Sequence, residues 1–328
     1  MKNLVVPKYK KIERELDMRI SKCLVLLISV ISLAITFGCG GGGGGSDSGS
    51  SSTGTLSMSM TDAKPVLPET SGKTISNVFV TIDDVLVHSP GAGWISLASK
   101  MVENPYTIDL LQFTGGATTE FVPPVPLDSG KYTQIRLSVI SAKLRFNEDP
   151  KDEVEITIPS ENLKTNKNFD FEVPEANNNG DGNPADPAAV DITIDFDLSR
   201  SLVFEGEVFK LKPVLHIVET DNAATIEGYI TKTSFPTEGY VVITVFDSTG
   251  QEYTSLRVDQ DTTVDETAYS IFWLVPNQAY RVDINYNPAT DDVVDESVNV
   301  PNDPNPNDQV KPVLQPGQSF PLDFDKTT

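Results

Sequence analysis

The loop at residues 177–186 has the residue types and spacing of a calcium-binding loop. Its side-chain oxygens would come from Asn177, Asn179, Asp181 and Asp186. Oxygen ligands at alternating positions, followed here by Gly182, let a loop wrap around a hard cation. Ala188 stands where a closing glutamate is expected. The same residues also form solvated turns, and we favour that interpretation because calcium sites usually have more carboxylates. Calcium is therefore the only candidate cofactor.

A second acidic group follows this loop. Asp191, Asp195 and Asp197 alternate with apolar residues that begin at Ile192. Side chains two apart on a strand lie about 7 Å from each other, near the separation of glycosidase carboxylates. A catalytic pair needs opposed, unequal environments, whereas Asp195 and Asp197 are expected to share one solvated face. We therefore expect an exposed acidic face or a cation-binding stripe, with a secreted hydrolase that uses Asp195 or Asp197 as an alternative.

Other motifs predict no catalytic residue. The segment 71–74 resembles the end of a phosphate-binding loop, but Leu67 stands where that motif needs a glycine. The chain contains neither a Gly-x-Ser-x-Gly nor a His-Glu-x-x-His pattern. His88 and His216 are far apart in the chain, and each is expected at a strand end or on a sheet face without a partner. The sequence therefore predicts a protein that is not an enzyme.

Cys39 lies between an apolar run and a glycine run. A basic segment precedes about fifteen mainly apolar residues, 23–37, a length typical of a signal sequence and too short for a membrane span. Glycines occupy residues 40–45, and a Ser/Gly-rich stretch follows. This order is typical of a bacterial lipoprotein precursor, in which residues 1–38 are removed and Cys39 carries the lipid. Met18 is an alternative start, and an uncleaved membrane tether is the alternative to lipid attachment.

Charge and cysteine content exclude several classes of protein. The 328-residue chain has a formal net charge of −22. Residues 1–38 carry seven Lys or Arg and three Asp or Glu, so removing this net +4 leaves −26. Such a field repels the phosphates of nucleic acid. The two cysteines, Cys23 and Cys39, fall in the apolar run and at the lipid site, so no disulfide framework is expected.

Alternating apolar residues with frequent turns predict an all-β fold. Val78, Val80 and Ile82 share one face, and a phase slip after Asp83 predicts a β-bulge. Strands are expected at 169–173 and 192–198, paired with each other, and a helical turn only at 106–112. Short alternating strands separated by turns are typical of an antiparallel sandwich or barrel. We expect two antiparallel β-sandwich domains of immunoglobulin-like or prealbumin-like type.

A series of motifs in the first half resembles a known family. They are, in order, the segment from Gly54 to Ala63, Val80-Thr81-Ile82-Asp83 with Val87-His88, Gly93-Trp94-Ile95, Asp109-Leu110-Leu111, the segment from Gly130 to Leu137, Ile158-Pro159-Ser160, Asp195-Phe196-Asp197-Leu198 with Ser201, and Leu211-Lys212-Pro213-Val214. Together they resemble a bacterial lipoprotein domain of unknown function, number 4382, over about residues 54–219. The resemblance implies export and an all-β domain, and it implies no activity.

The series of alternating strand segments restarts after residue 221. Five strands are expected at 226–230, 241–246, 253–258, 269–275 and 280–286, with a closing strand at 316–324. The segment from Phe272 to Asn277, followed by Tyr280-Arg281-Val282, is similar to carboxypeptidase-regulatory-like, transthyretin-like modules, although a glycine after Pro276 is missing. The expected organisation is a signal peptide at 1–38, a tether at 39–53, and β-sandwich domains at 54–220 and 221–328.

The expected function is non-catalytic binding or adhesion at the cell surface. The partners would be the membrane, through the lipid, and an extracellular protein or glycan, without nucleic acid. Trp94, Trp273, Tyr240 and Tyr253 could stack on sugars, although packing is the commoner use of such residues. Gly40 after the cysteine resembles lipoproteins that are sorted to the outer membrane. A purely structural envelope or matrix protein is the main alternative.

Overall fold

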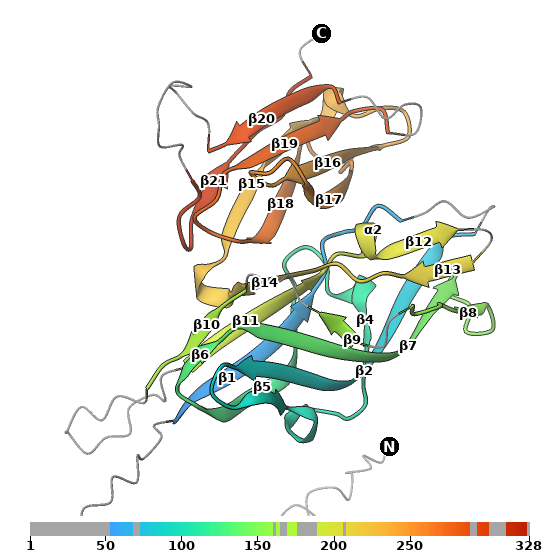
Figure 1. The fold of residues 1–328 in the computed structure, drawn as a ribbon. Coiled ribbons are helices and arrows are strands. Elements are labelled where there is room, and N and C mark those ends of the chain that lie inside the picture. Colours follow the sequence, from blue (N-terminus) through green and yellow to red (C-terminus); the bar gives the residue numbers. More distant parts are fainter. Residues whose placement is uncertain are drawn as a thin grey trace, which may run out of the picture. The chain divides into compact units, whose positions relative to one another are not determined.

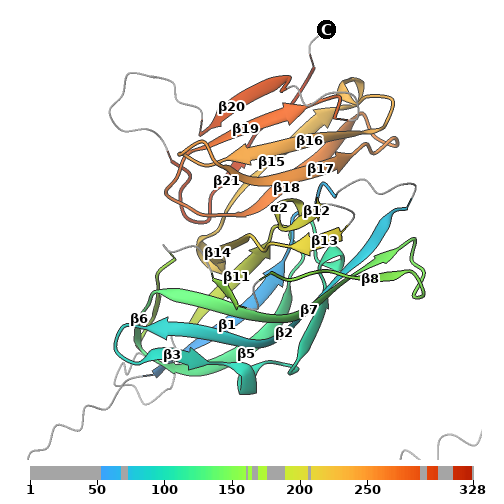
Figure 2. The same cartoon turned by 45° about the vertical axis from the view of Figure 1, so that its right-hand side comes forward.

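The described part of the protein is built almost entirely from strands. The computed structural model describes residues 53–67, 73–159, 162–164, 169–175, 189–205, 208–288, 294–301 and 313–326. Cys39 and the candidate calcium ligands Asn177, Asn179, Asp181 and Asp186 lie outside these residues. The described strands form several mainly antiparallel sheets, which confirms the predicted all-β class. Residues 51–328 form one compact unit, and its strands gather into a first lobe (53–219) and a second lobe (224–326; Figure 1 and Figure 2).

The first sheet of the first lobe contains a parallel strand pair. In spatial order its strands are β14 (Leu215–Glu219), β11 (Ala189–Phe196), β1 (Thr53–Thr61) and β5 (Thr119–Asp128). β1 and β11 run parallel, with Met60 opposite Ile194, whereas the other neighbours are antiparallel. Consequently, the ends of β1 and β11 meet at one edge of the sheet.

The second sheet of this lobe is built on two long strands. Its members are β3 (Gly93–Ser96), β2 (Ile75–Ser89), β7 (Gln134–Phe146) and β8 (Glu153–Glu155), with β4 (Tyr106–Asp109) on β2 and β9 (Asn162–Lys164) on β7. The register of β2 against β7 shifts between Ile82 and Asp84, which confirms the predicted bulge. The helical turn expected at 106–112 is limited to the 3-10 turn η3 (Leu110–Gln112), since β4 occupies the rest.

One predicted strand pairing is wrong. The strand expected at 169–173 is present as β10 (Phe171–Val173), but it pairs with β6 (Gly130–Tyr132) and not with β11. The rings of Phe171 and Tyr132 stack with centroids 5.1 Å apart. Alternation identifies the buried face of a strand, but it does not identify the neighbouring strand, because every buried strand shows the same pattern.

The two sheets of the first lobe enclose one hydrophobic core. Leu56, Met58 and Met60 of β1 are fully buried, as are Val78 and Val80 of β2, and all belong to the same cluster. The shorter elements around this core are η2 (Ala98–Lys100), α2 (Leu198–Ser201) and the hairpin of β12 (Leu202–Glu205) and β13 (Val208–Leu211). The alternating apolar residues thus hold the sheets face to face.

The second lobe has its own sheets and its own core. One sheet has the order β17 (Glu252–Asp259), β16 (Tyr240–Phe246), β19 (Tyr280–Asn285) and β20 (Glu296–Val300), and the other β18 (Glu266–Leu274), β15 (Ala224–Thr231) and β21 (Ser319–Pro321). The turns η4 (Thr220–Asn222) and η5 (Lys232–Ser234) flank β15. The five predicted strands are present, whereas β20 was not predicted. The buried hydrophobics, from Ala224 to Phe324, form a cluster separate from the first.

Candidate functional site

Three aspartates are buried where the two lobes meet. Asp62 follows β1, Asp195 lies in β11 and Asp197 precedes α2, and their exposed fractions are 2, 4 and 1%. The solvated face predicted for Asp195 and Asp197 is therefore wrong. β11 is an inner strand of its sheet, and residues of β17 and β18 lie across the junction from Asp195. Asp191 is exposed as predicted and accepts a hydrogen bond from Ser57.

Each of these aspartates has one oxygen without a hydrogen-bond donor among the described residues. Asp62 Oδ1 accepts the Leu198 N–H at 3.1 Å, and Asp197 Oδ1 accepts the Arg200 N–H at 3.1 Å, which caps α2. The Ala63 N–H hydrogen-bonds Asp195. The oxygens that lack a partner are Asp62 Oδ2, Asp195 Oδ1 and Asp197 Oδ2. Buried carboxylates normally accept hydrogen bonds at both oxygens, so these groups need another source of stabilisation.

Burial shifts the acidity of two of these carboxyls. Loss of solvent is the main cause that raises the pKa of Asp62 well above its ordinary value, and the charge of Asp195 adds to it. Burial also raises the pKa of Asp195 to about 7; His216 opposes this shift and Asp197 reinforces it. Burial therefore favours the protonated form of both carboxyls, and Asp195, with its pKa of about 7, exchanges a proton near neutral pH.

His216 joins this cluster from β14. Its side chain is 6% exposed, and its Nε2 lies 3.6 Å from Asp197 Oδ2. The ring stacks on Tyr253 of β17, with centroids 3.9 Å apart. Arg200 Nη1 donates to the carbonyl oxygen of Tyr253 at 3.2 Å. His216 thus lies on a strand, as expected, but it has a ring partner, and Tyr253 packs in the interior and does not present a surface to sugars, because the second lobe packs over both.

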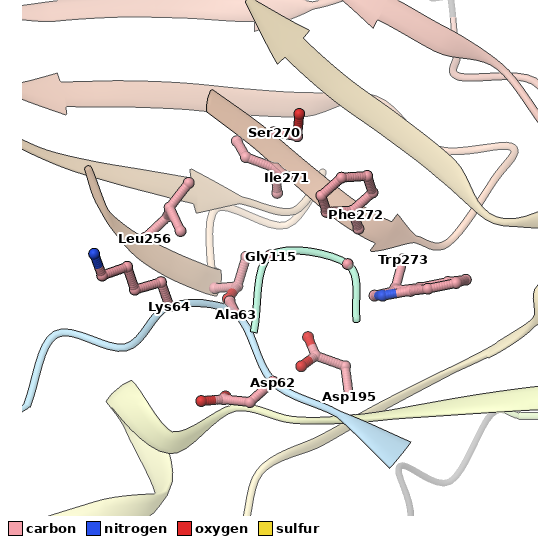
Figure 3. A pocket seen from close by; sticks show the side chains of 12 residues that line it. Asp62, Ala63, Lys64, Gly115, Asp195, Leu256, Ser270, Ile271, Phe272 and Trp273 are labelled. Carbon is pink, nitrogen blue, oxygen red and sulfur yellow. The ribbon is translucent and has the colours of Figure 1, made fainter. Parts of the chain in front are cut away.

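A small cavity adjoins the aspartates. Its volume is about 20 Å³, room for one water molecule, and its lining includes Asp62, Asp195, Thr254 and Trp273. Figure 3 shows the two aspartates on one side of the cavity, with Phe272 and Trp273 of β18 on the other. Thr254 Oγ1 and Trp273 Nε1 are buried and lack a partner among the described residues. The lining combines these polar groups with apolar side chains such as Leu256, and the volume admits only a water-sized group.

An open hollow lies beside the cavity on the surface. Its volume is about 310 Å³, and it shares Lys64, Gly115 and Phe272 with the cavity. Arg257 lies 3.8 Å above the ring of Tyr240 and pairs with Asp259, which also pairs with Lys64. The hollow thus combines aromatic, aliphatic and charged side chains.

The remaining candidate residues are spread over other surfaces. His88 packs beside Trp94, with ring centroids 4.9 Å apart, and its Nδ1 lies 2.9 Å from Thr133 Oγ1. Arg136 lies 3.7 Å above the Trp94 ring. Among the described residues, no group of three or more His, Cys, Asp or Glu is arranged to hold a metal ion. Most of the buried side-chain polar atoms that lack a hydrogen-bond partner in the described part of the chain lie at the junction of the two lobes.

Three of the motifs that carried the sequence resemblance meet at this junction. Asp62 contacts Leu198 through the hydrogen bond described above, and the Asp197 N–H donates to the carbonyl oxygen of Val214 at 3.1 Å. Ser201 Oγ accepts the Val214 N–H at 2.8 Å. Segments far apart in the chain thus form one hydrogen-bonded unit around the carboxyls. Sequence reasoning missed Asp62 as a site residue; its place directly after a buried alternating strand was the available signal.

The family comparison covers the segments that carry these motifs. Residues 53–213 match the family model of a domain of unknown function, DUF4382. This match confirms the resemblance inferred from the motifs. The similarity of residues 221–328 to transthyretin-like modules and the exact domain boundaries stay predictions. Because the function of DUF4382 is unknown, the match indicates no catalytic family.

The solved structures that resemble the chain do so only distantly. A leucine-rich repeat protein from Bacteroides thetaiotaomicron is 10% identical, with a TM-score of 0.20 over 85% of this chain, which spans only 27% of that protein. A putative adhesin from Bacteroides ovatus is 8% identical, with a TM-score of 0.24 over 84% of this chain and 87% of its own. BcpA, the major pilin subunit of Bacillus cereus, is 10% identical, with a TM-score of 0.21 over 83% and 69%. Similarity this low carries no argument about function.

Two further findings bear on the chain. A search of curated proteins found no match to the chain. None of the helices in the described part of the chain has the length and hydropathy that a membrane span requires.

Proposed function

We propose that this protein is a non-catalytic binding protein of the bacterial envelope, anchored by lipid on Cys39. The location is supported by the sequence around Cys39, where a short apolar run precedes the cysteine and a glycine tether follows it. The outer membrane is the expected site, since Gly40 follows the cysteine. A purely structural envelope protein is the alternative.

The enclosure of the buried carboxyls is the observation that carries the non-catalytic interpretation. A glycosidase places its two carboxyls on either side of a substrate cleft. Asp195 instead faces a cavity of about 20 Å³, and Asp197 faces His216 in the interior. No sugar or peptide can reach these groups while the lobes are in contact. The arrangement supports a structural role for the carboxyls.

The hollow beside the junction is the candidate binding surface. Its volume of about 310 Å³ is at the lower end of the range for small-ligand sites. Phe272 offers aromatic surface, and Arg257 and Asp259 offer a donor and an acceptor. Such a lining suits a short segment of an extracellular protein or a glycan.

Lipid attachment can be tested by metabolic labelling with a fatty-acid analogue. We expect the label in the wild-type protein and in a Cys23→Ala variant, because Cys23 is removed with the signal segment. The Cys39→Ala variant should lose the label and leave the membrane fraction. Label that persists in the Cys39→Ala variant would refute the lipid anchor.

Binding can be tested by cross-linking on intact cells followed by affinity capture. Arg257→Ala changes the hollow, whereas Arg281→Ala is a matched control, because Arg281 also stacks on an aromatic ring and pairs with an aspartate in the same sheet. We expect a reproducible partner with the wild type and Arg281→Ala, and at least a tenfold loss with Arg257→Ala. No captured partner would favour the structural alternative. A partner lost on calcium chelation would support the candidate loop at 177–186.

A further inference from the structure

The two lobes touch through polar contacts and through the stack of His216 on Tyr253, and Leu256 of the second core lines the cavity between them. The Arg257 N–H donates to the Lys64 carbonyl oxygen at 3.1 Å, and Ser199 Oγ donates to the Ser255 carbonyl oxygen at 3.3 Å. The hydrophobic clusters of the lobes are separate. Moving the lobes apart would uncover Tyr253 and the cavity lining but would leave each cluster within its own lobe, so the polar groups at the junction influence whether the lobes stay in contact.

Each of the two buried carboxyls has a backbone N–H donor at one oxygen and lacks a donor at the other among the described residues. Asp62 Oδ2 and Asp195 Oδ1 are buried without a hydrogen-bond partner among the described residues. The nearby cations bond elsewhere: Arg200 Nη1 donates to the Tyr253 carbonyl oxygen, and Lys64 pairs with Asp259. A charge on either carboxyl would thus be buried, with only backbone N–H groups and His216 to offset it, unless water or a cation entered.

Acidic groups outnumber basic groups around these two carboxyls. The titratable and charged side chains around them are Asp62 and Lys64 after β1, Asp195 in β11, Asp197 and Arg200 at α2, His216 in β14, Glu252 and Tyr253 in β17 and Tyr280 in β19. β18 contributes Ser270, Phe272 and Trp273, none of which titrates in the physiological range. Ionisation therefore adds negative charge to a site that already contains it.

We propose that the junction is a proton-operated latch, which holds the lobes together while Asp62 and Asp195 are protonated and loosens when they ionise. Protonated carboxyls can donate hydrogen bonds and carry no charge, so they are tolerated in the closed cavity. Ionised carboxylates need hydration, and the cavity has room for only one water molecule. Separation of the lobes supplies that hydration and changes the hollow that shares Lys64 and Phe272 with the cavity.

The direction of the pH effect follows from the acidity of Asp195. Burial raises its pKa to about 7, whereas an aspartate in an unfolded chain has a pKa of about 3.9. The closed form therefore retains a proton that the open form releases. Protonated Asp195 therefore contributes fully to the stability of the closed form below about pH 4, and this contribution is lost as the pH rises through about 7.

Trp273 provides a direct measurement of this opening. The chain has two tryptophans, so Trp94→Phe leaves Trp273, at the cavity, as the only indole. The protein would begin at residue 39 and carry Cys39→Ala, which keeps the compact unit 51–328 complete. Between about pH 5 and 8.5 we expect the Trp273 emission to shift to longer wavelength, with a midpoint near pH 7.

Asparagine variants identify the groups responsible. Asp195→Asn and Asp62→Asn should each weaken the shift, and the double variant should abolish it while its circular dichroism spectrum stays native. Asp109→Asn is the matched control, because Asp109 is buried but accepts hydrogen bonds from Asn77 and the Val78 N–H. This control should keep the full shift.

Three results would overturn the proposal. The first is a Trp273 emission that does not change with pH, and the second is a shift that survives in the double variant. The third is reversal of the shift at pH 8 by submillimolar calcium, which would identify the cluster as a cation site. A failure of the latch would leave the binding test with Arg257→Ala unaffected, so the two proposals can be separated.

Discussion

A buried aspartate at the end of a strand has few roles open to it. Asp195 and Asp197 sit two residues apart, as catalytic pairs often do, yet one faces a closed cavity and the other faces His216. Burial favours protonation of Asp195, and Asp197 lies against His216, so neither is placed to attack a substrate. The residue types alone were compatible with a catalytic role and with a structural role, and the burial of both side chains favours the structural role.

Gly116 is the residue that lets the loop at 113–117 approach the second lobe. Its φ is +86°, and an added Cβ would lie 2.9 Å from the Phe272 ring. We expect Gly116→Ala to lower the free energy of unfolding by about 2–3 kcal/mol, through backbone strain and the clash together. Denaturant unfolding measures this change.

Gly115→Ala is the control for the Gly116 prediction. Gly115 also has a positive φ, of +66°, but nothing lies within 4 Å of its added Cβ. The control should therefore cost only about 1 kcal/mol, from the backbone alone. Equal costs for the two variants would show that Phe272 moves freely and that the loop does not hold the junction.

In the second lobe, β21 and the residues after it pack against β15 through a close backbone contact at Gly228. An added Cβ on Gly228 would lie 1.8 Å from the Leu322 carbonyl oxygen. The Leu322 N–H donates to the Glu227 carbonyl oxygen at 2.9 Å, and the Tyr229 N–H donates to Asp323 Oδ1 at 2.9 Å. β21 and the residues after it can therefore dock only against a glycine.

We expect Gly228→Ala to release the closing strand. The variant should lose about 3 kcal/mol of unfolding free energy, and limited proteolysis should cut near residue 322. Gly91→Ala is the control, because nothing lies within 4 Å of its added Cβ and its φ is not positive; it should stay within about 0.5 kcal/mol of the wild type. Unchanged proteolysis of Gly228→Ala would contradict this role of the contact.

At the scale of the whole molecule, the dominant property is negative charge. The formal net charge of −22 makes the compact chain repel itself. Raising the ionic strength from about 0.01 M to about 0.15 M shortens the Debye length from about 30 Å to about 8 Å. We expect the melting temperature to rise by about 2–4 °C, as measured by differential scanning calorimetry.

The identity of the salt separates screening from specific binding. Sodium chloride and choline chloride should act equally, because screening depends only on ionic strength. A rise produced by calcium alone, at the same ionic strength, would instead indicate a bound cation. A melting temperature that falls with either monovalent salt would show that the ion pairs outweigh the repulsion.

The sequence by itself determined the fold class, most of the strands and the bulge after Ile82. These features depend on local alternation and turn residues, which each segment carries within itself. It also predicted the family resemblance that the match over 53–213 confirms. β20 escaped prediction because Glu296 to Val300 contains more polar than apolar residues.

Only the tertiary structure decided the pairing of β1 with β11 and the burial of Asp195. Parallel pairing brings the ends of two strands, more than 130 residues apart in the chain, to one edge of the sheet. The second lobe then covers that edge with Tyr253 and Trp273. Alternation shows that a strand has two faces, but what covers the second face depends on a distant part of the chain. The same aspartate is therefore exposed or buried according to contacts that no local pattern encodes.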